Sequence, residues 1–314
     1  MQRLLPTLAL LAALQAVAAP APALPAEGSA QLELDISLGH ESSSSPLVRV
    51  SDSGALVAVP GLSRLAGTVG RASVNASAEG VLTGDLRWTA TGVVDARPSR
   101  DAPGLGFQLG LADGALRWPL AGGTLGLGPS VLALSVGGRA FRQTAAMHLD
   151  WMRAPTEGLV QVWRIDLARH RHAADFSDLD AEVVAPSCNW QWAEPGLGLS
   201  KLDLGWGLRS ERNRQGLPEL SNRGAHLLGE LGWDALGTAW SLNLMLQRTV
   251  FAAAVSPDLP ARRDTLVAVD LSAQWRLAEH LDLRASVGTA RNRARPWLYE
   301  NRHSHAELGL SAHW

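Results

Sequence analysis

AELGLSAHW, residues 306–314, is the stretch of the 314-residue chain that decides its fold. Apolar and polar side chains alternate along it, and the apolar series is Ala306, Leu308, Leu310, Ala312 and Trp314. Because successive side chains of a β-strand point to opposite faces, this period of two predicts a strand with one apolar and one polar face. The same period fits a half-buried strand of a soluble β-sandwich, so the rest of the chain must indicate what the apolar face contacts.

An aromatic residue ends this strand, which thereby resembles the closing strand of bacterial outer-membrane β-barrels. The resemblance implies that Trp314 lies in the aromatic girdle at a membrane surface. It also implies that Leu308, Leu310, Ala312 and Trp314 belong to the signal read by the barrel-insertion machinery of a Gram-negative bacterium. The expected partners are this machinery, periplasmic chaperones, outer-membrane lipid and lipopolysaccharide.

The N-terminus predicts export. Arg3 supplies a positive charge, residues 4–17 are largely apolar, and small residues occupy Ala16 and Ala18. This order is typical of a secretory signal peptide, with cleavage expected between Ala18 and Leu24. A membrane-anchoring helix is the alternative, but the apolar stretch is shorter than the ~20 residues that a span needs. We therefore expect a signal peptide over residues 1–24 and an outer-membrane barrel over residues 25–314.

The composition excludes several classes of function. A net charge of -2, 18% charged residues and the lack of a basic run argue against a nucleic-acid partner. Cys188 is the single cysteine, which rules out an intramolecular disulfide, and a small apolar role in a strand is expected for it. No motif indicates a cofactor.

The alternation recurs along the C-terminal half as a series of strands. It covers residues 201–209, 226–234, 240–247, 267–276 and 281–288. Each run has about the 9–11 residues that a tilted membrane strand requires. The apolar series carries tryptophans near the strand ends, and the predicted membrane girdle consists of Trp151, Trp206, Trp233, Trp240, Trp275 and Trp314.

The connections alternate between short and long. Residues 234–239 and 277–280 are short connections, whereas residues 210–223, 248–264 and 291–302 are long and polar. This is the pattern of an up-and-down transmembrane barrel, with tight periplasmic turns and longer extracellular loops. Placing Trp314 in the periplasm puts every long connection outside, so both termini are expected to be periplasmic.

Charged residues of both signs occupy the face opposite the apolar one. A soluble monomer would expose that apolar face as a large patch, whereas lipid covers it in a barrel. The charges then face a wet or salt-bridged lumen, where they form a candidate pathway. The predicted lumen-facing residues are Lys201, Asp203, Arg209, Glu230, Asp270, Arg276, Asp282, Arg284 and Glu307.

The N-terminal third continues the pattern with phase slips near Asp113 and Pro129. We assign its strands to residues 32–40, 65–77, 81–95, 104–116 and 124–136, with loops at residues 41–63 and 97–103. With the intervening strands, the fold is an all-β antiparallel barrel of about fourteen strands, and twelve or sixteen would also be even.

The end of the chain also resembles a particular family. Arg263-Asp264, Arg291-Asn292-Arg293, Tyr299-Glu300-Asn301-Arg302 and Glu307-Leu308-Gly309-Leu310 carry the resemblance. Together they look like the barrel of surface lipoprotein assembly modifiers, and they are similar to the barrels of tetratricopeptide-repeat outer-membrane proteins of exopolysaccharide secretion. The resemblance implies an exported lipoprotein or polysaccharide as partner. Its specific motifs lie within residues 263–310, at the end of the barrel, and it does not extend to the helical repeats of those proteins.

The histidines are the candidate residues for a catalytic or metal site. Ser304, His305 and Glu307 could supply a nucleophile, a base and an acid, but Ser304 and His305 are strand neighbours that point to opposite faces. The pairs His170/His172 and His303/His305 have no carboxylate or thiol at ligand spacing. We therefore expect neither an enzyme nor a metal site.

These patterns predict a porin-like or export channel for a solute or polymer. Two alternatives stay open. The barrel could be a component of surface lipoprotein translocation, as the resemblance implies. It could also be a plugged structural barrel whose lumen charges pair across strands.

Overall fold

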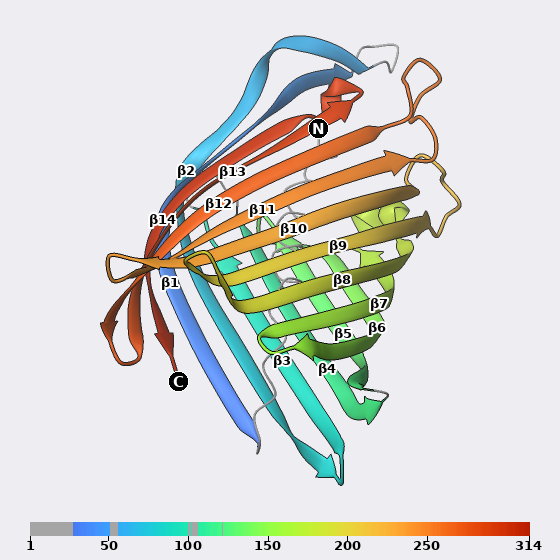
Figure 1. Ribbon diagram of the computed structural model, residues 1–314. Coiled ribbons are helices and arrows are strands. Elements are labelled where there is room, and N and C mark those ends of the chain that lie inside the picture. The colour runs from blue at the N-terminus through green and yellow to red at the C-terminus, as the bar shows by residue number, and fades with distance from the viewer. Residues whose placement is uncertain (1–27, 51–55, 100, 102–105, 121) are drawn as a thin grey trace.

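The computed structural model describes residues 28–50, 56–99, 101, 106–120 and 122–314, with side chains from residues 46–50 and 56–64 left out. Fourteen antiparallel strands in these residues form one closed barrel (Figure 1). The strands are β1 (Ser29–Val50), β2 (Leu56–Thr83), β3 (Leu86–Arg97), β4 (Phe107–Leu120), β5 (Gly123–Val136), β6 (Arg139–Thr156), β7 (Leu159–His172), β8 (Ala181–Gly196), β9 (Leu199–Asn213), β10 (Asn222–Ala235), β11 (Thr238–Phe251), β12 (Arg263–Ala278), β13 (Leu281–Arg295) and β14 (Asn301–His313).

The stretch at residues 306–314 closes the ring. It forms most of β14, which pairs with the preceding strand β13 and with β1 at the other end of the sheet. Beyond β14, Trp314 donates its backbone N–H to the Leu32 carbonyl at 2.9 Å, and Leu32 donates back at 3.0 Å. The predicted fold class is confirmed: an all-β, antiparallel, up-and-down barrel of fourteen strands.

Short and long connections lie at opposite ends of the barrel. Two-residue turns at 157–158, 197–198, 236–237 and 279–280 join strands at one end. Longer connections at 173–180, 214–221, 252–262 and 296–300 join them at the other, where residues 137–138 form one short turn. The backbone N–H of His313 bonds to the His280 carbonyl at 3.2 Å, so β14 ends on the short-turn side.

The expected loop at residues 41–63 is largely strand. β1 continues to Val50 and β2 begins at Leu56, so the connection is much shorter than predicted. The four serines at positions 42–45 hide the alternation of side chains, but ladder hydrogen bonds use only backbone groups. For the same reason β9 runs on to Asn213 and β11 to Phe251, inside segments expected to be loops.

The turn between the strands expected at residues 65–77 and 81–95 lies further along the chain than predicted. β2 runs through Gly80 to Thr83, and the turn is Gly84-Asp85, where Gly84 has a φ of +53°. A Cβ on Gly80 would lie 2.8 Å from Nε1 of Trp88, its partner on β3. Gly80 therefore makes room for an indole and does not bend the chain.

The ladder is irregular at two prolines, of which Pro129 lies near an expected phase slip. Pairing of β8 with β9 skips Ala185 and Pro186, because proline has no N–H to donate. Pairing of β4 with β5 likewise has a gap opposite Pro129. The sheet stays closed around both sites.

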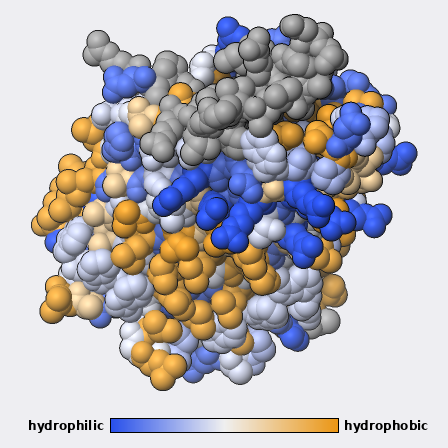
Figure 2. Space-filling model, turned by 90° about the horizontal axis from the view of Figure 1, so that it is seen from above, coloured by the Kyte–Doolittle hydropathy of each residue, from blue (hydrophilic) through white to orange (hydrophobic). Residues whose placement is uncertain are grey.

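The two faces of the wall differ sharply in exposure. On the outer face Leu38 is 64% exposed and Leu308 56%, whereas on the inner face Asp35 is 7% exposed and Glu41 2%. Figure 2 shows hydrophobic residues gathered along the rim of the molecule and hydrophilic residues nearer its middle. In the described part of the chain, no helix is long and apolar enough to cross a membrane.

Candidate functional site on the inner wall

All nine residues predicted to face the lumen take part in ion pairs of the inner wall. Lys201 joins two strands, with Nζ 3.1 Å from Asp203 and 2.8 Å from Glu230. The remaining pairs are Arg209–Glu211, His305–Asp270, Arg276–Asp282, Arg284–Asp35, Arg284–Glu33, Arg97–Glu307 and Arg71–Glu307. The wall is thus lined by mixed charges whose partners lie on the same strand, as for Arg209 and Glu211, or up to three strands away, as for Arg97 on β3 and Glu307 on β14.

The densest group lies on β1, β2, β3 and β14. Arg97 on β3 approaches Glu41 at 3.3 Å, Glu307 at 3.6 Å and Asp95 at 3.8 Å. Arg71 on β2 pairs with Asp95 at 3.1 Å. The sequence-based prediction included only Glu307 of this group, because Glu41 was assigned to a loop. Glu33, Asp35 and Glu41 are separated by even numbers of residues, and this spacing is the signal in the sequence that would have placed Glu41 on the inner face of β1.

A second group surrounds His148 on β6. The imidazole is fully buried, with Nδ1 3.5 Å from Asp113 and Nε2 3.6 Å from Asp150. Arg117 pairs with Asp150 at 2.7 Å, and Arg164 pairs with Asp113 at 3.2 Å. No residue of this group is among the predicted lumen-facing residues. Asp113 and Arg117 lie on β4, where the expected phase slip obscures the two faces.

A third group of side chains lies on β6, β7 and β9, nearer than the His148 group to the end of the barrel with the longer connections. His170 accepts a hydrogen bond from Arg209 Nη2 at 2.9 Å, and Arg209 pairs with Glu211 at 2.6 Å. Thr144 lies 2.9 Å from the other imidazole nitrogen of His170. Arg142, in register with His172 on β7, completes this basic group.

The connection between β7 and β8 packs against the inner wall. Its short helix η2 (Ala174–Leu179) brings Phe176 beside Phe141 with ring centroids 5.3 Å apart. Phe176 and Leu179 pack against the buried cluster of Leu109, Leu134 and Phe141. Since the partner of Leu109 in the ladder is Asp95, an inner-wall residue, this connection folds toward the interior.

Asn213 joins the β7–β8 connection to the next long one. Its Nδ2 donates to the Asp178 carbonyl at 2.5 Å and to the Asp180 carbonyl at 3.2 Å. Its Oδ1 accepts the backbone N–H groups of Gln215 at 3.0 Å and Leu217 at 3.2 Å. The side chain is 2% exposed, so one buried amide holds two connections in place beside the basic group.

The predicted girdle tryptophans occur mostly in contact pairs. Trp233 stacks on Trp240 at 6.2 Å, and Trp240 meets Trp275 edge-on at 6.4 Å. Trp206 meets Trp163, which was not predicted, at 6.0 Å. The remaining two predicted positions are Trp151, whose ring lies 5.2 Å below the Arg153 guanidinium, and Trp314, which is 60% exposed.

Cys188 lies between two of these rings in the ladder. Its register partners are Trp163 on β7 and Trp206 on β9, and the thiol side chain is 1% exposed. A small residue at this position lets the two indoles meet above it. Cys188 therefore has the apolar, buried surroundings in a strand that the sequence predicted for it.

Ser304, His305 and Glu307 do not meet as a catalytic triad. His305 faces inward to Asp270, while Ser304 Oγ lies 3.2 Å from Thr289 Oγ1 on the other face. His303 and His305 have ring centroids 6.0 Å apart. Across the described residues, no group of three or more His, Cys, Asp and Glu side chains could hold a metal ion.

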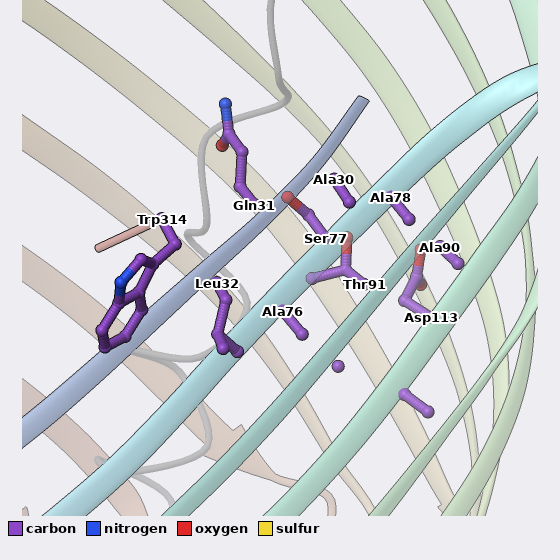
Figure 3. A pocket seen from close by; sticks show the side chains of 12 residues that line it. Ala30, Gln31, Leu32, Ala76, Ser77, Ala78, Ala90, Thr91, Asp113 and Trp314 are labelled. Atoms are coloured by element: carbon purple, nitrogen blue, oxygen red, sulfur yellow. The ribbon is translucent and has the colours of Figure 1, made fainter. Parts of the chain in front are cut away.

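A pocket of 650 Å³ lies at the short-turn end of β1 to β4. Figure 3 shows the short side chains of Ala30, Ala76, Ala78 and Ala90 beside Leu32 and Trp314. Leu32 is 42% exposed, and Ala76 is its ladder partner, so these alanines belong to the outer face. The lining also includes Gln31, Ser77, Thr91 and Asp113, which alternate with these alanines along the strands and belong to the inner face. Asp113 is part of the group around His148, so residues of both faces of the wall line the pocket.

A scan against protein-family models finds no match to the chain, and a search of curated proteins finds none either. Solved structures with a similar fold include the anion-selective porin from Comamonas acidovorans, at 10% identity and a TM-score of 0.44 over 92% of this chain and 100% of that one. The outer membrane protein OpdK from Pseudomonas aeruginosa has 11% identity and a TM-score of 0.43 over 91% and 99%. The KdgM porin, solved with disordered oligogalacturonate, has 11% identity and a TM-score of 0.36 over 66% and 91%. At these identities the likeness extends to the fold alone.

Proposed function

We propose that the chain is an integral outer-membrane barrel with a porin-like channel for a charged solute or polymer. The observation that carries the proposal is the division of one closed wall into two chemically opposite faces. Long aliphatic side chains such as Ile36, 58% exposed, line the outside, whereas every predicted inner charge has an ionic partner inside. An exposed aliphatic belt is costly in water and stable in lipid.

The orientation follows from the two ends of the barrel. Trp314 and the two-residue turns face the periplasm, and the longer connections face the exterior, as in other bacterial barrels. The tryptophans form the girdle at the lipid surfaces. Insertion then depends on the barrel-insertion machinery and periplasmic chaperones, and the outer surface contacts lipid and lipopolysaccharide.

Two measurements test this proposal together. The protein is expected in outer-membrane fractions with heat-modifiable migration on gels, and the purified protein is expected to give discrete conductance steps in planar bilayers. Recovery from the soluble periplasm would contradict the membrane placement. A membrane-inserted protein without conductance would contradict the channel.

A plugged, non-conducting barrel is the alternative that the inner wall itself supports. Arg97 contacts three carboxylates, and in the group around His148 the charged side chains pair with one another. Many charges of the inner wall therefore already have protein partners. Such pairing can stabilise a filled interior as well as line a pore. The same bilayer recording separates the two functions.

Surface lipoprotein translocation is the second alternative, supported by the resemblance of residues 291–302 and 307–310 to that family's barrel end. Deleting the gene would then remove a specific lipoprotein or polysaccharide from the cell surface, as measured by surface proteolysis and antibody labelling. An unchanged surface would exclude this alternative.

A further inference from the structure

Arg142 differs from the other cations of the inner wall. Arg97, Arg117, Arg164, Lys201, Arg209 and Arg284 each form an ion pair with a carboxylate. The Arg142 side chain has no ion pair and no hydrogen bond within the described residues, and its Nε is buried without a partner. A buried guanidinium N–H without an acceptor is costly, and an anion bound to the guanidinium would complete it.

The neighbouring Arg209 is held in place by a neutral histidine. Arginine carries only donors, so the 2.9 Å contact between Arg209 Nη2 and His170 Nε2 makes that nitrogen an acceptor. The proton of His170 is then on Nδ1, where it is donated to Thr144 Oγ1 at 2.9 Å. His170 is therefore a positioning residue that adds no charge.

The carboxylate near these arginines neutralises only one of them. Glu211 pairs with Arg209 at 2.6 Å, and Arg142 interacts electrostatically with both of these residues. Asp180 is the other acid beside the group, and its Oδ1 accepts a hydrogen bond from the backbone N–H of His172 at 2.7 Å. Two guanidiniums and one carboxylate, which pairs with Arg209, leave an excess positive charge on this part of the wall.

We propose that Arg142 and Arg209 form a binding site for the oxyanion of a solute, a carboxylate or phosphate group, at the long-connection end of the interior. The site deepens the proposed channel function and rests on it, because it names the class of solute that the channel would select. Guanidiniums bind oxyanions through charge-assisted, frequently bidentate hydrogen bonds. Asn213 and helix η2 keep the site's surroundings in place.

The test is equilibrium dialysis of the full-length protein in detergent micelles, at low salt, with radiolabelled inorganic phosphate in one arm and benzoate in the other. Arg142→Gln should weaken binding about tenfold, as the loss of one charge-assisted hydrogen bond predicts. Arg142→Lys, which keeps the charge, should retain most of it. Arg276→Gln is the matched control, since Arg276 is 74% exposed on a distant part of the wall.

Heat-modifiable migration of each variant checks that the barrel has folded. Tighter binding of benzoate than of phosphate would assign a carboxylate solute, and the reverse a phosphate solute. Equal binding by wild type and Arg142→Gln, or binding by neither, overturns the site. Bilayer recording is independent: conductance without Arg142-dependent binding leaves the channel and removes the site, whereas Arg142-dependent binding without conductance keeps the site and removes the channel.

Discussion

His305 on β14 and Asp270 on β12 form an ion pair across a strand that separates them, with Nε2 and Oδ2 2.9 Å apart. The residue between them in both ladders is Gly288 on β13. A Cβ there would lie 2.5 Å from Asp270 Oδ2 and 2.5 Å from His305 Cε1. Gly126 occupies the same position beneath the pair of Arg117 and Asp150. Glycines of the inner wall thus allow charges two strands apart to meet.

Gly288→Ala should break the pair of His305 and Asp270. The new methyl group needs the space that both side chains occupy, so we expect a loss of about 1–3 kcal/mol, the usual cost of overpacking. The urea midpoint of the protein in phospholipid vesicles measures it. Gly110→Ala is the control, because nothing lies within 4 Å of a Cβ there. Equal midpoints for both variants would contradict the steric role of Gly288.

Arg97→Met should destabilise the barrel much more than a change at an exposed arginine. Removing Arg97 leaves Glu41, Asp95 and Glu307 together without their shared cation, and breaking a buried pair on one side costs about 3–5 kcal/mol. Arg276→Gln, at an exposed arginine, should change stability by less than about 0.5 kcal/mol. Similar urea midpoints for the two variants would show that the group contributes little.

Asn213→Ala should loosen two connections without unfolding the barrel. Four backbone groups lose their partner, and each buried unsatisfied group costs about 1–3 kcal/mol unless water reaches it. Hydrogen exchange is expected to accelerate in residues 173–180 and 214–221 and to stay unchanged in β12 and β13. Gln215→Ala, which removes one exposed bond to the Ser177 carbonyl, is the matched control. Uniform acceleration over the whole chain would indicate global destabilisation instead.

Deleting Trp314 should lower the yield of assembled barrel. The deletion removes the two backbone hydrogen bonds between Trp314 and Leu32 that extend the closing seam. If the terminal aromatic is also part of the insertion signal, Trp314→Phe should assemble normally and Trp314→Ser poorly, since both keep the backbone bonds. The fraction with heat-modifiable migration in outer membranes measures assembly. Equal assembly of the Phe and Ser variants would limit the role of Trp314 to its backbone.

The C-terminal half was predictable because its signals are local. From Lys201 onward the two faces alternate without slips, and short turns such as Leu236-Gly237 separate the strands. The inward charges could be selected there by parity alone. In the N-terminal third, serines at positions 42–45 obscure the period, and Gly80 imitates a turn, so Glu41, Arg71 and Arg97 were missed.

Contacts between strands could not be predicted in the same way. Whether Asp270 meets His305 depends on the stagger of three strands, and a one-residue slip would turn one partner to the other face. Helix η2 lies within a segment that the sequence predicts as a polar loop, yet Phe176 and Leu179 pack against a buried cluster of residues from β4, β5 and β6. Such packing has no periodic signature.

The sequence by itself determined an antiparallel barrel of about fourteen strands whose last strand ends on the short-turn side, because side-chain alternation and turn length are properties of neighbouring residues; the structure fixed the number at fourteen. The tertiary structure alone decided which charges pair and which arginine has no carboxylate. Those outcomes depend on the register of β6, β7 and β9 around the ring, which brings Arg142 to His172 and Arg209 to His170. Register is set by the whole sheet and not by any one strand.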